Sequence, residues 1–198
     1  MVGPSIKPTA IPKTKEETEI MSSNATATET VPTTFNPCDP SHMPQPTKEH
    51  EWLQKFVGEW ESEVEMAMAP DQPPMKSKGS NRDRMLGGFW LISEGGNPDM
   101  GFNFQLTLGY DSKKKKYIGT WTDSMTSYLW KYEGTVNAAG NILTLETKGP
   151  SPMSPDNFAS FREVTEFKNA DLRVFTSSML GDHGKWNTFI TVTSRRKK

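Results

Sequence analysis

The chain has 198 residues, 33% of them hydrophobic, and a formal net charge of −1, which fits one domain with a tail and excludes a general attraction to nucleic acid or anionic membranes. The single cysteine, Cys38, excludes an intramolecular disulfide and favours a reducing, cytoplasmic location. No run of 18 apolar residues occurs, so we expect no membrane-spanning helix.

The first 45 residues are rich in Pro, Thr, Ser and Glu and almost free of aromatic residues. Such a segment cannot bury enough apolar surface to offset the entropy lost on ordering. We therefore predict a disordered tail over residues 1–45 and a folded domain over residues 46–198. Met21 is an alternative start, and Cys38 with His42 is too small a ligand set for zinc. We predict no metal and no cofactor.

A short helix is expected to open the folded domain. Thr47 is a suitable N-cap, and acidic residues in the first turn complement the helix dipole. Trp52, Leu53 and Phe56 form a small apolar stripe. We expect Gly58 to end the helix in a left-handed conformation and His50 to be a capping or surface residue.

After Gly58 the apolar period changes to two residues. Glutamates at positions 59, 61, 63 and 65 alternate with mostly apolar residues, which predicts a strand with one solvated face and one buried face. The buried face is expected to carry Trp60, Val64, Met66 and Met68.

Short alternating segments separated by turn residues continue to the C-terminus. We predict further strands over residues 76–84, 89–94, 102–110, 117–123, 128–133, 142–148, 159–167, 172–179 and 185–195, with loops over 95–99 and 149–155. No helix is long enough for a crossover, so we expect sequential antiparallel hairpins. Such a meander loses its exposed edges by closing, which predicts an all-β, up-and-down barrel of about ten strands; a two-sheet sandwich is the alternative.

Gly58-Glu59-Trp60, directly after the expected helix, resembles the G-x-W signature of the calycin superfamily, to which the lipocalins belong. The resemblance implies that an arginine near the end of the last strand stacks over Trp60 and closes the barrel, as cation–π attraction favours. Arg195 and Arg196 are the candidates. Strand parity favours Arg196, unless a bulge brings Arg195 inward.

Within this superfamily, four further motifs resemble those of one particular family. They are LGGFW at 86–90, LGYD at 108–111, GTWTDSM at 119–125 and YEG at 132–134. They are similar to those of a widespread, largely bacterial family known as a domain of unknown function with a lipocalin-like fold. The resemblance covers about residues 48 to 198. It implies a barrel and no established activity.

A ten-stranded barrel is wider than an eight-stranded one, whose side chains nearly fill it, so we expect a cavity. Methionine and aromatic side chains suit an adaptable pocket. Our leading hypothesis is therefore a non-enzymatic protein that binds a small hydrophobic or amphipathic molecule; the alternative for each lining residue is ordinary core packing. By strand parity the ligand-binding candidates are Met66, Met68, Phe104, Tyr117, Trp121, Trp130 and Tyr132.

Asp123 is the candidate catalytic residue, because it shares the alternation of Tyr117 and Trp121. Beside Tyr128 or Arg162 its carboxylate could act as an acid, a base or a ligand anchor, which would suit a cyclase or isomerase. The alternative is an Asp that caps the turn at Ser124. A filled barrel with a structural or interaction role is the third hypothesis.

Two further polar features are expected to be solvated. His183 lies in a Gly-Asp-His-Gly turn and is predicted to be exposed, not a haem or metal ligand. The lysine run 113–116 is predicted to be a hairpin tip. No nucleophile elbow, phosphate-binding loop or dinucleotide fingerprint is present.

Overall fold

The computed structural model describes residues 43–67, 72–152 and 154–198. The chain divides into two units, Met1–Met43 and Pro44–Lys198, and every described helix and strand belongs to the second. The predicted tail over 1–45 therefore lies almost wholly outside the described residues, as do Met21, Cys38, His42 and Met68.

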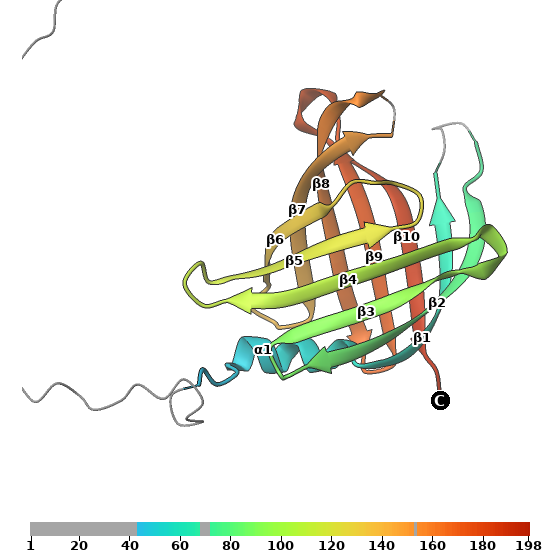
Figure 1. The fold of residues 1–198 in the computed structure, drawn as a ribbon. Helices are drawn as coiled ribbons and strands as arrows, with labels where there is room; N and C mark the ends of the chain where they lie inside the picture. Colours follow the sequence, from blue (N-terminus) through green and yellow to red (C-terminus); the bar gives the residue numbers. More distant parts are fainter. Residues whose placement is uncertain (1–42, 68–71, 153) are drawn as a thin grey trace, which may run out of the picture. The chain divides into compact units, whose positions relative to one another are not determined.

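The second unit is a closed barrel of ten antiparallel strands, in which each strand pairs with its neighbours in sequence and β1 pairs with β10 (Figure 1). The all-β, up-and-down barrel predicted from the alternation pattern is confirmed. The strands are β1 Gly58–Met66, β2 Met75–Leu86, β3 Trp90–Asn97, β4 Phe102–Asp111, β5 Lys116–Asp123, β6 Trp130–Val136, β7 Ile142–Ser151, β8 Ser154–Asn169, β9 Leu172–Leu180 and β10 Trp186–Arg196.

The helical part is small. Helix α1 (Lys48–Trp52) continues as the 3-10 helix η2 (Leu53–Phe56), and both lie at the lower end of the barrel in Figure 1. Single 3-10 turns, η3 (Pro98–Met100) and η4 (Asp182–Gly184), lie in the β3–β4 and β9–β10 connections. In the described parts of the chain, no helix has the length and apolar character needed to cross a bilayer.

Two predicted loops are wrong in part, because strands include some of their residues. Positions 95–97 belong to β3, where a Cβ at Gly95 or Gly96 would collide with the backbone of the neighbouring strand. Glycine there permits close strand approach and is not a turn signal. The predicted loop 149–155 is replaced by the ends of β7 and β8, with a register shift after Pro150 that accommodates its missing N–H.

Gly58 does not cap the helix as predicted. It is the first residue of β1, with φ +138°, far from the left-handed helical conformation of a C-cap. A Cβ at this position would collide with the Arg196 guanidinium. Glycine is thus needed for its positive φ and for the close approach of Arg196.

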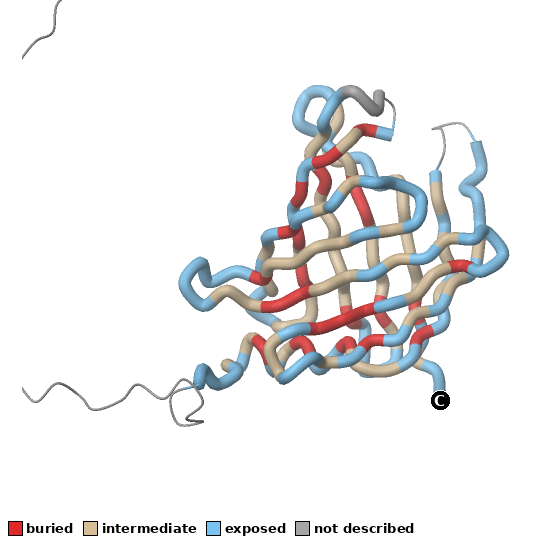
Figure 2. Tube along the Cα trace, in the orientation of Figure 1, coloured by how far each residue is buried: buried red, intermediate tan, exposed pale blue. Residues whose placement is uncertain are grey.

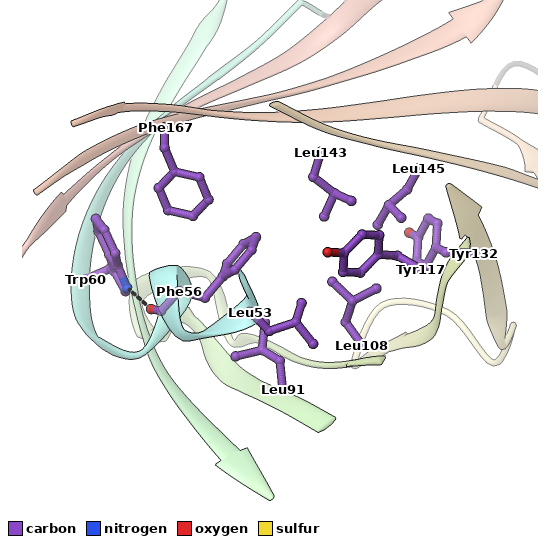
Figure 3. Close-up of a cluster of buried hydrophobic side chains, with 10 residues drawn as sticks. All are labelled: Leu53, Phe56, Trp60, Leu91, Leu108, Tyr117, Tyr132, Leu143, Leu145 and Phe167. Atoms are coloured by element: carbon purple, nitrogen blue, oxygen red, sulfur yellow. Dashed lines mark hydrogen bonds between the residues drawn. The ribbon is translucent and has the colours of Figure 1, made fainter. Parts of the chain in front are cut away.

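The core lies at the end of the barrel that holds α1 and η2. Leu53 and Phe56 of η2 point into the space enclosed by the strands and pack against the inward side chains (Figure 3). Along β1 the four glutamates are exposed, and Trp60 on the opposite face is only 1% exposed, as the alternation predicts (Figure 2). The core cluster consists of Leu53, Phe56, Trp60, Leu91, Leu108, Tyr117, Tyr132, Leu143, Leu145 and Phe167.

Candidate functional site

The inward-facing side chains differ between the two ends of the barrel. Near α1 most of the core side chains are buried, whereas at the opposite end several inward side chains are partly exposed, although Thr147, Phe161 and Ser177 there are buried. In a closed barrel a side chain that points toward the axis gains exposure only through the interior or the rim. At this end, therefore, some inward side chains reach solvent through the interior or the rim. We call it the open half and define it by six partly exposed inward residues: Met66, Phe104, Trp121, Trp130, Glu163 and Ile190.

Aromatic side chains from adjacent strands line one side of the open half. Phe104 on β4 stacks on Trp121 on β5, with ring centroids 4.2 Å apart and planes 11° from parallel. Trp121 is the register partner of Trp130 on β6, and Trp130 meets Phe161 on β8 edge-on at 5.3 Å. A Cβ at Gly149 would collide with the Trp130 ring, so this glycine makes room for the indole. We call Phe104, Trp121, Trp130 and Phe161 the aromatic wall.

The other predicted ligand-binding residues have different environments. Tyr117 is buried in the core, where its hydroxyl donates to the Glu49 carbonyl at 3.0 Å and its ring contacts Trp52. Met66 ends β1 beside Ile190 and is partly exposed. Tyr132 is buried at the boundary between the core and the open half. The aromatic wall is thus the part of the predicted pocket that the fold brings together.

Glu163 on β8 is an inward charged residue that sequence reasoning missed. It lies between Leu145 on β7 and Ser177 on β9. The Tyr132 hydroxyl donates to Oε1 at 3.2 Å, and the nearby Ser177 hydroxyl lowers the pKa of the carboxyl. No ion pair within the described ranges includes Glu163. Glu163 is separated from Phe161 and Phe167 by an even number of residues, so its side chain points to the same face of the strand. This is the sequence signal that could have predicted its inward position.

The surroundings of Glu163 change its titration. Burial against the barrel wall raises the pKa of this carboxyl to about 7, and the hydrogen bonds from Tyr132 and Ser177 only partly oppose the rise. Burial, followed by the charge of Glu163, raises the pKa of the Tyr132 phenol well above its usual range. At neutral pH the phenol is a neutral donor, and Glu163 is close to its midpoint.

Thr147 adds an unpaired polar atom beside this carboxylate. It is an inward residue of β7, 7% exposed, opposite Phe161 and two positions from Leu145. Its Oγ1 has no hydrogen-bond partner among the residues that the structure describes. A buried hydroxyl without a partner is uncommon and calls for an explanation. We call Tyr132, Thr147, Glu163 and Ser177 the polar floor of the open half.

Asp123 caps the turn that follows β5. Its Oδ1 accepts hydrogen bonds from the backbone N–H groups of Met125 and Thr126 at 2.8 and 3.0 Å, and its Oδ2 accepts from the Trp121 indole at 2.9 Å. The suggestion that Asp123 lies beside Arg162 is wrong, because Arg162 pairs with Glu146 on the outer face. Tyr128 instead donates to the Lys148 carbonyl. The Asp123 carboxylate therefore holds the turn and orients Trp121.

Arginines pack against Trp60 at the opposite end. The guanidinium carbons of Arg196 and Arg173 each lie 4.2 Å from the Trp60 ring centroid, and the indole N–H donates to the Phe56 carbonyl at 2.7 Å. Arg195 points outward and is exposed. The sequence reasoning missed Arg173, which also forms a buried ion pair with Asp83 at 2.8 Å. We call this cluster, with α1 and η2, the closed end.

The histidines and the lysine run have structural or solvated positions. His50 accepts a hydrogen bond from the Thr47 N–H at 3.0 Å, which confirms capping, but it is buried between Phe89 and Tyr110 and not at the surface. His183 is exposed in η4 and the lysine run 113–116 is an exposed tip, as predicted. Within the described ranges, no three His, Cys, Asp or Glu side chains gather where they could hold a metal ion.

A hollow of about 660 Å³ lies on the outer wall of β1 to β4. Outward side chains such as Glu61, Arg82, Glu94 and Gln105 line much of it, and it is open to solvent. Exposed charged walls give little apolar area to bury a small molecule. The open half, with its aromatic wall and polar floor, is the stronger candidate site.

Comparison with solved structures identifies similar barrels. The crystal structure of Rv2717c from M. tuberculosis aligns with a TM-score of 0.57 at 11% identity, over 78% of this chain and 100% of that chain, which shows a shared fold. A protein with unknown function from the DUF3598 family of Nostoc punctiforme aligns with a TM-score of 0.38 at 15% identity, over 78% of this chain and 50% of that chain.

A search of curated proteins finds no match. Residues 45–196, which include all ten strands, match the family described as "Protein of unknown function (DUF1579)". The chain belongs to the DUF1579 family.

Proposed function

We propose that this protein binds a small amphipathic molecule in the open half of its barrel. The observation that carries the proposal is the juxtaposition of the aromatic wall with the polar floor, in which Trp121, Trp130 and Glu163 are partly exposed. Mostly apolar walls with a few convergent polar groups are typical of small-molecule sites.

The two parts of the site would act differently on a ligand. Burial of apolar ligand surface against Phe104, Trp121 and Trp130 would contribute roughly 25 cal/mol per Å². The polar floor would fix the orientation of the ligand, because a carboxylate without a cation and an unpaired hydroxyl favour a partner that satisfies them. Apolar area would thus supply affinity, and the floor would supply specificity.

We also propose that the barrel is of the calycin kind and serves in the cytoplasm. Gly58-Glu59-Trp60 after a short helix, with Arg196 stacked on Trp60, supports the calycin assignment. The single cysteine supports the location.

Titration with N-phenyl-1-naphthylamine, a neutral fluorophore that brightens in apolar surroundings, tests the proposal. We expect saturable binding by the wild type and at least about tenfold weaker binding by Trp130→Ala, which corresponds to about 1.4 kcal/mol of lost contact. Trp90→Ala is the matched control, because Trp90 packs on Gly109 outside the barrel, and it should bind like the wild type. Absence of binding, or equal loss in both variants, would contradict the proposal.

A cyclase or isomerase is the second candidate, with Glu163 and Tyr132 in place of Asp123. A carboxyl with a pKa of about 7 suits a general acid or base, whereas Asp123 is occupied in its turn. Native mass spectrometry of the purified protein would detect a co-purified molecule. Recovery of that molecule unchanged after incubation with fresh protein supports binding; its conversion supports catalysis.

A further inference from the structure

We infer that the polar floor selects ligands whose polar end is a primary ammonium group and rejects ligands that end in a carboxylate. This inference rests on the proposed binding in the open half and names the class of molecule bound there. It follows from the charges that face the barrel interior, from the unused hydrogen-bonding capacity of the floor and from the position of the aromatic wall.

Among the described residues, two inward-facing carboxylates, Asp123 and Glu163, have no cation partner. Arg173 is paired with Asp83 and lies against Trp60, so neither charge is available to a ligand. Arg196 donates to the carbonyls of Val57, Lys55 and Ala170 at the closed end. Asp123 accepts three hydrogen bonds from its own turn and Trp121. Of these two carboxylates, Glu163 accepts fewer hydrogen bonds and so keeps more capacity for a ligand in the open half.

The floor has acceptor capacity to spare. A carboxylate has about four lone-pair sites, and the Tyr132 hydroxyl donates to one of them, with the Ser177 hydroxyl nearby. Thr147 Oγ1 is a further acceptor without a partner, on the strand next to Glu163. An ammonium group has three N–H donors, and Glu163 and Thr147 together can accept hydrogen bonds from all three. A carboxylate in the same place would meet a like charge and an already committed Tyr132 hydroxyl.

The rest of the ligand would extend toward the rim. Glu163 pairs with Ser177, Ser177 pairs with Ile190, and Ile190 pairs with Met66 at the far end of β1. The aromatic wall stands at the same end of the barrel. An alkyl or aryl body attached to the ammonium would therefore be buried among apolar side chains. The recognised class is an amphipathic amine that enters with its polar end first.

Recognition should depend on the protonation of Glu163. The groups that face it are Tyr132 from β6, Leu145 and Thr147 from β7 and Ser177 from β9. Tyr132 is the only one of these that titrates, and it stays neutral below alkaline pH because burial raises its pKa. Protonation of Glu163 removes the negative charge, so amine affinity should fall as the pH drops below about 7.

Displacement of N-phenyl-1-naphthylamine by decylamine, decanol and decanoate tests the inference. The amine and the carboxylate keep their charges at both pH 8 and pH 6, so any pH effect on their relative affinity comes from the protein. At pH 8 we expect decylamine to bind at least about tenfold more tightly than decanoate, as a charge-assisted hydrogen bond predicts. At pH 6 the preference should shrink severalfold.

Single substitutions show which residues cause the preference for decylamine. Glu163→Gln should lose most of the preference for decylamine over decanoate. Glu146→Gln, on the adjacent strand but on the outer face, should behave like the wild type. Thr147→Val removes the unpaired hydroxyl with little change of shape and should weaken decylamine severalfold more than decanol.

The outcomes separate the two proposals. If the fluorophore binds but decylamine and decanoate compete equally at pH 8, or if Glu163→Gln keeps the full preference, the inference about the amine is wrong and ligand binding stands. If the fluorophore does not bind the wild type, both proposals are wrong. Should Glu163→Gln fail to fold, the pH 6 and pH 8 comparison in the wild type decides: an unchanged preference overturns the inference.

Discussion

The closed end and the open half share the same strands, but their polar groups are satisfied to different degrees. At the closed end the Trp60 indole N–H, Asp83 and the two arginines all have partners within the protein. In the open half Thr147 Oγ1 has no partner in the described part of the chain, and Glu163 has hydrogen bonds but no cation. At one end the polar groups are paired within the protein, and at the other some keep unused hydrogen-bonding capacity at a cost in stability.

The short helical segment is one cause of this difference. Leu53 and Phe56 of η2 enter the lower end of the barrel and complete its packing. At the other end η3 and η4 contribute no buried residue. A barrel of this width needs an inserted element to fill it, and the described residues supply one at a single end.

The largest effect is expected for Trp60→Ala at the closed end. It removes a buried aromatic ring and its contacts with Arg173 and Arg196, which should cost about 3–5 kcal/mol in urea unfolding. Trp121→Ala in the open half, where the ring is already partly exposed, should cost clearly less. A loss below about 1 kcal/mol for Trp60→Ala would show that this residue does not close the barrel.

Asp83→Asn should have the next largest effect, because it leaves Arg173 buried without a counter-charge. The Asp83 side chain is fully buried and its pair distance is 2.8 Å. Removing one partner of a buried ion pair should cost about 3 kcal/mol or more, measured by chemical unfolding at pH 7. A loss as small as that of an exposed pair would show that water reaches Arg173.

Glu163→Gln should stabilise the protein at alkaline pH. The pKa of Glu163 is about 7 in the folded state and near 4.5 otherwise, so the folded state binds the proton more tightly. The contribution of Glu163 to stability is therefore greatest below pH 4.5 and is lost as the pH rises to 7. At pH 8 the variant should be more stable than the wild type by no more than about 3 kcal/mol.

The free energy of unfolding should be measured for the variant and the wild type at each pH. The other carboxylates titrate in both proteins, so their contribution cancels in the difference. The stability difference should grow between pH 5 and pH 8 and then level off. A difference that stays constant over this range would show that Glu163 is well solvated.

Glu146→Gln should have the smallest effect, although its pair geometry matches that of Asp83. The Arg162–Glu146 distance is also 2.8 Å, but these side chains are 38% and 59% exposed. Exposed ion pairs contribute about 0.2–1 kcal/mol, so the loss should stay in that range and shrink with added salt. A cost like that of Asp83→Asn would refute burial as the deciding factor.

The inward or outward direction of many side chains in the barrel strands could be predicted from the local sequence pattern. Alternation of Glu and apolar residues in β1 placed Trp60 inward, because successive side chains of a strand point to opposite faces. The same rule places Glu163 inside, since it has the parity of Phe161 and Phe167. Glycine and proline misled the prediction at 95–97 and 149–155, where they mark close strand approach and a register shift, not loops.

Pairings between distant strands could not be predicted in this way. Arg173 and Asp83 are 90 residues apart, and only closure of the sheet brings them together beside Trp60. The neighbours of Glu163 come from β6, β7 and β9, whose register depends on every hairpin between them. A shift of one residue in any pair would exchange the inner and outer faces.

The sequence by itself determined the strand class, the order of the hairpins and the inward face of most strands, because these depend on a two-residue period and nearby turns. Only the tertiary structure decided which inward residues are packed, which remain exposed, and which charges are paired. Those properties depend on barrel closure and on the insertion of η2 at one end, and both are contacts between segments far apart in the chain.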